Sequence, residues 1–407
     1  MADTRSWTWR AFAPMQFVYL LVSFLAVSNT AALEPEGGTS YNHTDDEPQR
    51  RTFSTSHAHQ SLEVFTAHLP SRSAWSTRSR QLRSQAPAPA SGDHARQLAW
   101  RSIFKNVSDY YDRGIVLVVG TDATAEFTSI QDAIDQVPEF NTKRVTIYVK
   151  SGIYEEKVII PASKPYVTLQ GEGRNRTIIS WHDTAAAAGT LMSASVIVES
   201  DHFIARDISF KNTAHAPVPN ITNMQAAAIR ISGDKAFLLR CNFYSHQDTL
   251  YDHQGRHYYF RCFIQGSEDF VFGAARSLFQ RCVLHSIAHG DGGALVAQGK
   301  NFPGSIRMPS GFSFLQCHIK GTGMPYLGRA WGQYSTVVYS RCQIDANIRP
   351  VGWYDWGLRE REWTAYLGQF ECTGRGANST GRVSWSRELT PEEARPFQSV
   401  QFVDGPW

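Results

Sequence analysis

One short pattern recurs five times in the second half of the chain and limits what the chain can fold into. It has an apolar residue, a variable residue, Arg or Gln, Cys, a variable residue and an apolar residue, as in LLRCNF, YFRCFI, FQRCVL, FLQCHI and YSRCQI. The repeat cysteines are Cys241, Cys262, Cys282, Cys317 and Cys342, so the successive steps are 21, 20, 35 and 25 residues. The segment IARDISF resembles an earlier copy with Asp207 in the cysteine position.

The sequence around these repeats has the texture of short strands. From about Trp100, runs such as GIVLVVG, RVTIYVK, YVTLQG and SVIVES alternate with Gly, Asn, Asp and Pro. Such runs are strand and turn signals, and repeats of about 20 to 25 residues are typical of solenoids. We therefore predict an all-β fold, a parallel β-helix, with the right-handed winding that is the default for parallel crossovers.

The repeated cysteine has two interpretations. Stacked at one inward position, it can act as a small apolar filler. Alternatively, neighbouring coils bring Cys262 and Cys282 close enough to form a disulfide if the geometry allows it. With six cysteines in the chain, the sequence leaves the pairing open.

Two aspartates occupy the same place in consecutive repeats. Asp248 follows Cys241 by seven residues, and Asp269 follows Cys262 by seven residues. Equivalent positions in adjacent coils are about 4.8 Å apart, so we expect the two acids to be stacked neighbours. Two charges at that distance repel by about 3.5 kcal/mol at an effective dielectric constant of about 20, or roughly 2.5 pKa units. One acid would then hold a proton while the other is ionised, which provides an acid together with a base or nucleophile.

The alternative is that both acids are turn residues, because Asp is common between coils. The flanking segments HQDTLY and EDFVFG surround each acid with aromatic and apolar residues rather than with a Gly, Asn and Pro cluster. Aromatic residues beside paired acids are what a sugar-binding cleft would offer.

The first 99 residues have a different composition. Residues 1–32 have Arg5 and Arg10 before an apolar run and small residues after it, which predicts a signal peptide, with an uncleaved anchor as the alternative. Residues 33–99 are rich in Ser, Arg, His, Gln and Pro without periodicity, and we predict a disordered or processed pre-region. Residues 100–407 would form the β-helix domain. Sequons at Asn42, Asn106, Asn175, Asn220 and Asn378 agree with a secreted glycoprotein.

Composition excludes some classes of partner. The chain has 40 Lys and Arg against 37 Asp and Glu, a formal net charge of +3, without the dense basic stripe of a nucleic-acid binder. The apolar run near the N-terminus is short for a bilayer span, so stable membrane insertion is not expected. The histidines show no metal-ligand spacing, and neither a metal nor a cofactor is expected. Monomer is the default state for a solenoid with capped ends.

Five blocks in order give a resemblance to a known family. SGIYEEKV, MQAAAIR, HQDTLY, EDFVFG and YLGRAW resemble the plant pectin methylesterases, or pectinesterases, over about residues 105 to 407. The resemblance implies a right-handed parallel β-helix that removes methyl esters from the galacturonate units of pectin, releasing methanol in the cell wall. It implies pectin, as methylated homogalacturonan, as the substrate and a proteinaceous esterase inhibitor as a candidate partner.

The resemblance also assigns roles to positions of this sequence. Asp269 would be the nucleophile, and Asp248 the acid and then the base. Gln247 and Gln225 would donate hydrogen bonds to the tetrahedral oxyanion, which amides can do without titrating. Arg329 would hold the nucleophile ionised, which a poor nucleophile such as a carboxylate needs. In addition, Trp331 would pack on the sugar ring, and Thr190 matches a substrate-contact position in a less distinctive segment.

Taken singly, several of these residues have plainer explanations. Gln225 could be a solvated strand residue, Trp331 a core aromatic and Arg329 a surface charge. Trp353 and Trp356 of the segment GWYDW could stack on sugar or pack at the end of the solenoid.

The sequence departs from the family pattern in three places. Ala330 replaces the usual proline between Arg329 and Trp331, which loosens the backbone there. Glu268 stands where the family usually has an apolar residue, and its charge could raise the pKa of Asp269 or bind a cation. Residues 34–99 lack the helical periodicity of an inhibitor-like pro-domain, so control by such a domain is not expected.

Three other functions remain to be weighed. Acids about 5 Å apart also suit retaining glycoside hydrolysis, and wider pairs suit inverting hydrolysis, but a glycosidase has no need of two oxyanion amides. A lyase would want a cluster of acids for calcium, which the sequence does not show. A wall-binding solenoid without activity would be free to lose the Asp248, Asp269, Arg329 and Gln247 set, which is intact here.

Overall fold

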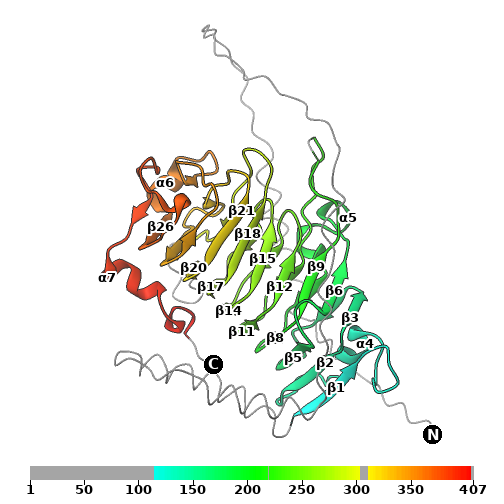
Figure 1. The fold of residues 1–407 in the computed structure, drawn as a ribbon. Helices are drawn as coiled ribbons and strands as arrows, with labels where there is room; N and C mark the ends of the chain where they lie inside the picture. The colour runs from blue at the N-terminus through cyan, green and yellow to red at the C-terminus, as the bar shows by residue number, and fades with distance from the viewer. Residues whose placement is uncertain (1–113, 219, 303–309, 405–407) are drawn as a thin grey trace, which may run out of the picture. The chain divides into compact units, whose positions relative to one another are not determined.

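The computed structural model describes residues 114–218, 220–302 and 310–404. Within these ranges the chain forms three parallel sheets, one of 11 strands and two of eight. Each strand pairs with the equivalent strand of the next coil, and every pairing is parallel. The predicted parallel β-helix is therefore confirmed (Figure 1). The predicted signal peptide at 1–32 and pre-region at 33–99 lie outside the described residues, and the domain boundaries stay predictions.

The three sheets take their strands from the coils in rotation. Sheet A contains β1 (Ile115–Val119), β2 (Val145–Val149), β5 (Val167–Gly171), β8 (Ile204–Arg206), β11 (Ala236–Leu239), β14 (Arg256–Phe260), β17 (Arg276–Gln280), β20 (Gly311–Leu315), β23 (Thr336–Ser340), β26 (Tyr366–Phe370) and β27 (Arg387–Glu388). Sheet B contains β3 (Gly152–Glu155), β6 (Thr177–Trp181), β9 (Ser209–Asn212), β12 (Asn242–Tyr244), β15 (Phe263–Gly266), β18 (Val283–Ile287), β21 (His318–Thr322) and β24 (Gln343–Ile344). Sheet C contains β4 (Val158–Ile160), β7 (Val196–Val198), β10 (Ile229–Ile231), β13 (Leu250–Asp252), β16 (Val271–Gly273), β19 (Val296–Gln298), β22 (Gly328–Ala330) and β25 (Trp353–Tyr354).

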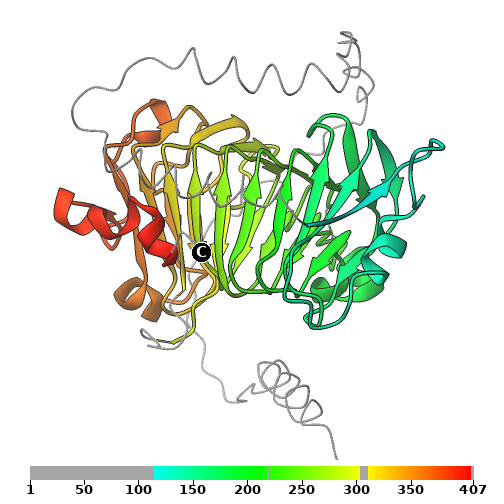
Figure 2. The same ribbon diagram turned by 90° about the horizontal axis from the view of Figure 1, so that it is seen from below.

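Short helices lie between the strands and at the two ends of the coil stack (Figures 1 and 2). They are α4 (Ile130–Asp135), α5 (Ala185–Ala188), α6 (Glu360–Thr364), α7 (Pro391–Ala394), and the 3-10 turns η2 (Thr190–Met192), η3 (Arg375–Ala377), η4 (Arg395–Phe397) and η5 (Val400–Val403). Helix α4 packs Ile130 and Ile134, both fully buried, onto the first coils and so covers one end of the core. Among the described residues, no helix combines the length and apolar content needed to cross a membrane.

The cysteine repeat marks the corner between sheets A and B. The residue before each repeat cysteine has a left-handed backbone, with φ between 47° and 56°, and these residues are Arg240, Arg261, Arg281, Gln316, Arg341 and, one coil further on, Glu371. A single left-handed residue turns the chain sharply, so the cysteine that follows has its side chain inside, and in the five repeats a strand of sheet B begins at the next residue. The Arg-Cys pattern therefore marks the same turn in successive coils.

The inward cysteines form a ladder of free thiols. All six are unpaired, and five are buried. Each thiol after the first contacts a backbone carbonyl of the preceding coil, as Cys262 does with Leu238 O at 3.4 Å and Cys282 with Tyr259 O at 3.5 Å. The filler interpretation is the one that holds, and the candidate disulfide between Cys262 and Cys282 is not formed in this structure.

The sequence placement of Asp207 is wrong by one residue. Strand β8 pairs with β11 so that Arg206 lies opposite Leu239. Asp207 therefore occupies the left-handed corner position equivalent to Arg240, with φ of 55°, and Ile208 takes the inward cysteine position. The carboxylate of Asp207 accepts hydrogen bonds from the guanidinium of Arg240, at 2.7 Å from Nε. An ion pair between corners of adjacent coils explains why a charged residue stands there.

Aromatic side chains stack inside sheet A. The rings of Tyr259, Phe279, Phe314 and Tyr339 follow one another at centroid distances of 4.4, 4.7 and 4.7 Å, and each pair is also directly opposite in the strand register. All four are fully buried. Offset stacking of this kind adds to the burial of apolar area, so the stack holds four coils in register.

This stack gives a first prediction. Phe279→Ala should lower the free energy of unfolding by about 3–5 kcal/mol, because it leaves a cavity between two rings. The matched control is Phe140→Ala, since Phe140 is 75% exposed and its truncation should change stability by no more than about 0.5 kcal/mol. Urea unfolding followed by tryptophan fluorescence measures both. Equal losses in the two variants would show that the stack does not hold the coils together.

Candidate active site

Asp248 and Asp269 lie at the corner between sheets B and C, in consecutive coils. Asp248 stands between β12 and β13, and Asp269 between β15 and β16. The residues before them, Gln247 and Glu268, pair across the coils, and Asp248 N donates to Glu268 O at 3.1 Å. The predicted stacking of the two acids is confirmed.

Both acids are turn residues as well as buried ones. Asp248 has φ of 66° and Asp269 has φ of 46°, a left-handed conformation that Asp adopts more readily than most residues. Yet their exposed fractions are only 7% and 5%. The two interpretations of the sequence therefore hold together, since the backbone makes the turn and the carboxyl groups stay away from bulk water. Backbone of this kind in a functional cluster is where strain is commonly held.

Arg329 binds the second acid from two coils away in the fold. It lies on β22, and its Nε is 2.8 Å from Oδ1 and 2.9 Å from Oδ2 of Asp269, while its Nη2 also contacts Oδ2. The guanidinium carbon lies 4.1 Å from the ring centre of Trp356, which covers it. A second carboxylate, that of Glu268, is 3.1 Å from Nη2. A guanidinium held this way is fixed in orientation as well as in charge.

The environment separates the proton affinities of the two acids. Burial raises the pKa of Asp248 well above its usual range, and the charge of Asp269 raises it further. Burial raises the pKa of Asp269 to about 6, although the guanidinium of Arg329 acts in the opposite direction. The charge of Glu268 adds to the rise of the Asp269 pKa. At neutral pH this gives a neutral carboxylic acid beside an ionised carboxylate, as the register predicted.

Two amides flank the acids on the same sheet edge. Gln247 precedes Asp248 directly, and Gln225 lies in the preceding coil, where Ala226 N donates to Gln247 O at 3.1 Å. Among the described residues, the side-chain oxygen Oε1 of Gln225 is buried and has no hydrogen-bond partner. A buried polar atom without a partner is costly, so this amide is placed to meet a polar group that the chain itself does not supply.

The outer face of sheet C offers an apolar surface beside these polar groups. The buried members of this surface are Ala194, Ile197, Ala227, Tyr251, Phe272 and Ala297. Trp331, which directly follows β22, is 38% exposed and its ring centre lies 6.2 Å from that of Phe272. Trp331 is therefore not a core residue, and its exposed ring continues the apolar surface.

Thr190 is the predicted site residue whose position is least informative. It begins η2, which precedes β7 of the same sheet, and it is half-buried. Its carbonyl accepts a hydrogen bond from Ser193 Oγ at 3.0 Å. Among the described residues, no hydrogen bond links Thr190 to either acid or to Arg329. Its contact with a ligand stays a prediction.

The two tryptophans of the GWYDW segment have different positions. Trp353 is 2% exposed and packs against Tyr339, so it is a core residue of the last coils. Trp356 covers the guanidinium of Arg329 instead. Packing is thus the correct interpretation for Trp353, and the contact of Trp356 with Arg329 was not anticipated from the sequence.

The segment around Ala330 is held by a residue that the sequence analysis missed. Ala330 is fully buried at the end of β22, and its carbonyl accepts a hydrogen bond from Nη1 of Arg361 at 2.6 Å. Arg361 belongs to α6, and the hydroxyl of Thr364 in the same helix donates a hydrogen bond to Gln333 O. The loosening expected from the missing proline is thus opposed by α6.

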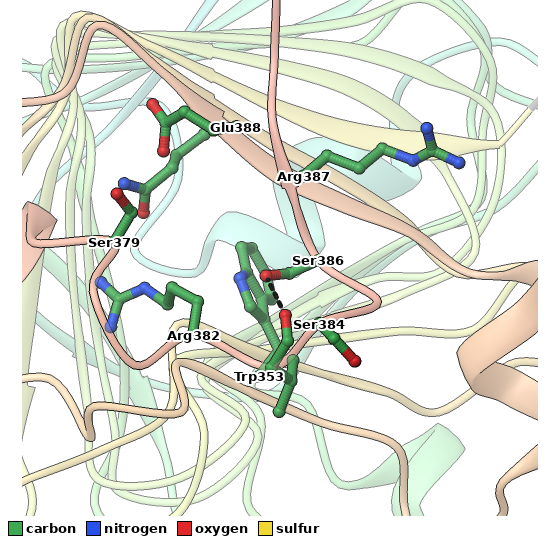
Figure 3. A pocket seen from close by; sticks show the side chains of 9 residues that line it. Trp353, Ser379, Arg382, Ser384, Ser386, Arg387 and Glu388 are labelled. Carbon is green, nitrogen blue, oxygen red and sulfur yellow. Dashed lines mark hydrogen bonds between the residues drawn. The ribbon is translucent and has the colours of Figure 1, made fainter.

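A separate cavity of about 250 Å³ lies among the last coils and the C-terminal segment (Figure 3). Its wall includes Trp353, Arg382 and Glu388. Arg382 Nη2 donates to Gly376 O at 2.6 Å and Ser386 Oγ donates to Val383 O at 2.8 Å, so these side chains tie down the backbone that closes the solenoid. None of the predicted site residues lines this cavity.

The geometry limits the chemistry of the site. The described residues contain no group of three or more His, Cys, Asp or Glu side chains arranged to hold a metal ion. What they bring together is an ionised carboxylate aimed by Arg329, a neutral carboxylic acid one coil away, and two amides beside them. This set can attack an acyl carbon, protonate a leaving group and stabilise a developing oxyanion.

Comparison with known proteins points to the same chemistry. A family profile described as Pectinesterase matches residues 116–406. Pectinesterase QRT1 of Arabidopsis thaliana is 45% identical over 299 residues, which cover 71% of this chain and 77% of that protein. Probable pectinesterase 8 of the same plant is 41% identical over 297 residues, covering 71% and 75%.

Solved structures agree with the sequence relatives. The pectin methylesterase from carrot superposes with a TM-score of 0.67 at 33% identity and covers 71% of this chain and 93% of its own. The pectin methylesterase from Aspergillus niger has a TM-score of 0.61 at 27% identity with the same coverage.

The electrostatics of the two acids predict effects on stability that have the same sign and different sizes. The pKa of Asp248 is higher in the folded than in the unfolded chain, so its ionisation favours unfolding as pH rises above about 4. Asp248→Asn should therefore stabilise the protein relative to wild type, and more at pH 8 than at pH 5. The pKa of Asp269 is also raised, to about 6, so Asp269→Asn should stabilise the protein at pH 8 as well, but less than Asp248→Asn does, because this substitution also removes the attraction to Arg329.

Urea unfolding of both variants at pH 5 and pH 8 measures this contrast. A smaller gain for Asp248→Asn than for Asp269→Asn at pH 8 would contradict the assignment of the neutral and ionised acid.

Proposed function

The chain belongs to the pectinesterase family and is an esterase, and from this premise we propose that it hydrolyses the methyl esters of galacturonate units in pectin by means of an aspartate nucleophile. The observation that carries the proposal is the bidentate contact of Arg329 with a buried Asp269, one coil from an acid whose pKa is raised. Released methanol and acidic pectin would be the products.

In the first half-reaction, a carboxylate oxygen of Asp269 attacks the ester carbonyl carbon. The carbonyl oxygen becomes an oxyanion, which the side-chain amides of Gln247 and Gln225 would stabilise. Asp248 gives its proton to the methoxy oxygen as the carbon–oxygen bond breaks, and methanol leaves. The product of this step is a mixed anhydride between Asp269 and the galacturonate carboxyl.

In the second half-reaction, water replaces the alcohol. Asp248, now ionised, takes a proton from a water molecule as its oxygen attacks the galacturonate carbon of the anhydride. The anhydride bond breaks and Asp269 leaves as a carboxylate, which Arg329 stabilises. Asp248 is again protonated, so the cycle returns to its starting state.

The substrate would lie along the outer face of sheet C. The apolar surface of Tyr251 and Phe272 and the exposed ring of Trp331 can pack against the flat faces of sugar rings. Gln225 Oε1, buried without a partner, would meet a sugar hydroxyl unless the amide is turned to donate to the oxyanion. Thr190 would contact the polymer further along the same sheet.

We place the enzyme in the cell wall. The predicted signal peptide, together with exposed sequons at Asn175, Asn220 and Asn378, favours a secreted glycoprotein. We also propose that the protein is a monomer and that a proteinaceous esterase inhibitor can bind it.

The reaction type can be tested directly. The secreted protein should release methanol from highly methylated pectin without forming new reducing ends. Asp269→Asn should lower methanol release by at least about 10³-fold, since loss of a covalent nucleophile removes the first step, while pectin binding is retained. New reducing ends would instead indicate a glycosidase, and binding without either product would indicate a non-catalytic wall protein.

The pKa of Asp269 predicts the acid limb of the activity profile. The nucleophile must be ionised, and its pKa is raised from 3.8 to about 6. As pH falls through about 6 the nucleophile takes up a proton, so kcat/KM for methanol release should drop about tenfold per pH unit below that value. An acid limb near pH 4 would mean that Asp269 is not the ionising group, or that its environment does not shift it.

A further inference from the structure

Glu268 is a third carboxylate at the reaction centre, and the mechanism above does not use it. Its Oε1 lies 3.1 Å from Nη2 of Arg329, the same nitrogen that contacts Asp269. The side chain is 35% exposed, so it lies at the surface beside the two acids, where the polymer would bind, rather than in the core. The backbone stacks Glu268 directly on Gln247 of the preceding coil.

The next coil makes room for this side chain. A Cβ atom on Gly293 would lie 2.3 Å from Cγ and 2.6 Å from Cδ of Glu268. Gly293 has no unusual backbone angle that would require glycine. A side chain at this position would overlap Glu268, so glycine here leaves the space that Glu268 occupies. Glu268 is therefore held over the following coil and toward Arg329, not free to swing into solvent.

The resulting cluster carries an excess of negative charge. Asp269 and Glu268 contribute two negative charges, and Arg329 contributes one positive charge, while Asp248 is neutral. The net charge is minus one, where a site without Glu268 would be neutral. Two other cations, Arg230 of sheet C and Lys157 just before β4, are themselves paired with Glu199 at 2.7 Å and Asp183 at 2.6 Å, so they do little to offset it.

We propose that Glu268 is a specificity-determining residue that selects methyl esters flanked by other methyl esters and disfavours those flanked by free galacturonate carboxylates. The inference rests on the proposed function and names the substrate class of that same site. A neutral ester neighbour binds beside Glu268 without electrostatic repulsion. An ionised neighbour is repelled there, because the cluster carries one negative charge more than Arg329 balances. The same repulsion expels the acidic product, so that successive esters of one chain are not removed as a block.

The size of the effect follows from a screened interaction. One charge pair at about 8 Å changes a binding constant by about fivefold when the effective dielectric constant is about 40, between that of water and that of a protein surface. Because such an interaction is screened, the preference should weaken as salt is added. A purely steric role of Glu268 would show no salt dependence.

The test uses defined galacturonate hexamers with the full-length secreted protein. One hexamer is esterified at every unit, and the other carries a single central ester between free acids. Wild type should show a higher kcat/KM per ester for the first, and Glu268→Gln, which keeps the shape and removes the charge, should reduce that preference by about fivefold. The preference of wild type should also shrink between low salt and about 0.5 M salt.

A matched control removes an equivalent charge elsewhere. Glu371 also pairs with an arginine, Arg341, at 2.7 Å, but it lies at the corner between sheets A and B after β26. Glu371→Gln should leave both the hexamer preference and its salt dependence unchanged. Calorimetric binding of the unesterified hexamer gives a second readout, in which Glu268→Gln should bind about fivefold more tightly than wild type or the control.

The outcomes separate the two proposals. Methanol release with the same hexamer preference and the same binding of the unesterified hexamer in wild type and Glu268→Gln overturns the role of Glu268 but leaves the esterase function intact. A folded Glu268→Gln protein that has lost activity on both hexamers and gains no affinity for the unesterified one also overturns it, in favour of a role in holding Arg329. If wild type releases no methanol from either hexamer, the result contradicts the proposed function and therefore also this inference, which depends on it.

Discussion

The parallel register between coils is the constraint on which the rest of the structure depends. Each residue lies about 4.8 Å from its equivalent in the next coil, so any feature that recurs in the sequence becomes a row in space. The cysteine ladder, the left-handed corners and the stack of Tyr259, Phe279, Phe314 and Tyr339 are three such rows. The acid pair is a fourth, and in it repetition brings two buried acids together at an energetic cost.

That cost is what makes the acid pair chemically useful. Asp248 and Asp269 are both removed from water, and neither alone would be ionised easily at neutral pH. Arg329 breaks the symmetry because it binds only one of them, so the pair divides into an acid and a nucleophile. Trp356 covers the guanidinium and limits its contact with water. Burial thus raises the pKa of both acids, and Arg329 limits the rise at Asp269 alone.

The sequence analysis predicted the features that recur from coil to coil and missed the contacts between segments that do not recur. The fold, the stacking of the acids and the separation of their pKa values follow from the step of 21 residues between Cys241 and Cys262. Asp207 was misplaced because Arg206 was aligned with the corner residue Arg240, whereas the strand pairing puts Arg206 opposite Leu239. The contacts of Arg329 with Trp356 and Glu268, and of Arg361 with Ala330, join segments whose spacing is irregular. Side-chain direction across such steps is decided by packing, which no periodicity records.

Two departures from the family pattern prove to be linked to compensating residues elsewhere. Glu268 is accommodated by Gly293, 25 residues later, and Ala330 is restrained by Arg361, 31 residues later. Both partners lie in a following coil or its loop, which is where the solenoid places the next wall of the cleft. A solenoid can therefore change one wall residue at a time, provided the adjoining coil changes with it. Because each coil packs mainly on its two neighbours, the space for Glu268 comes from the adjoining coil, and the register that stacks Asp248 on Asp269 is kept.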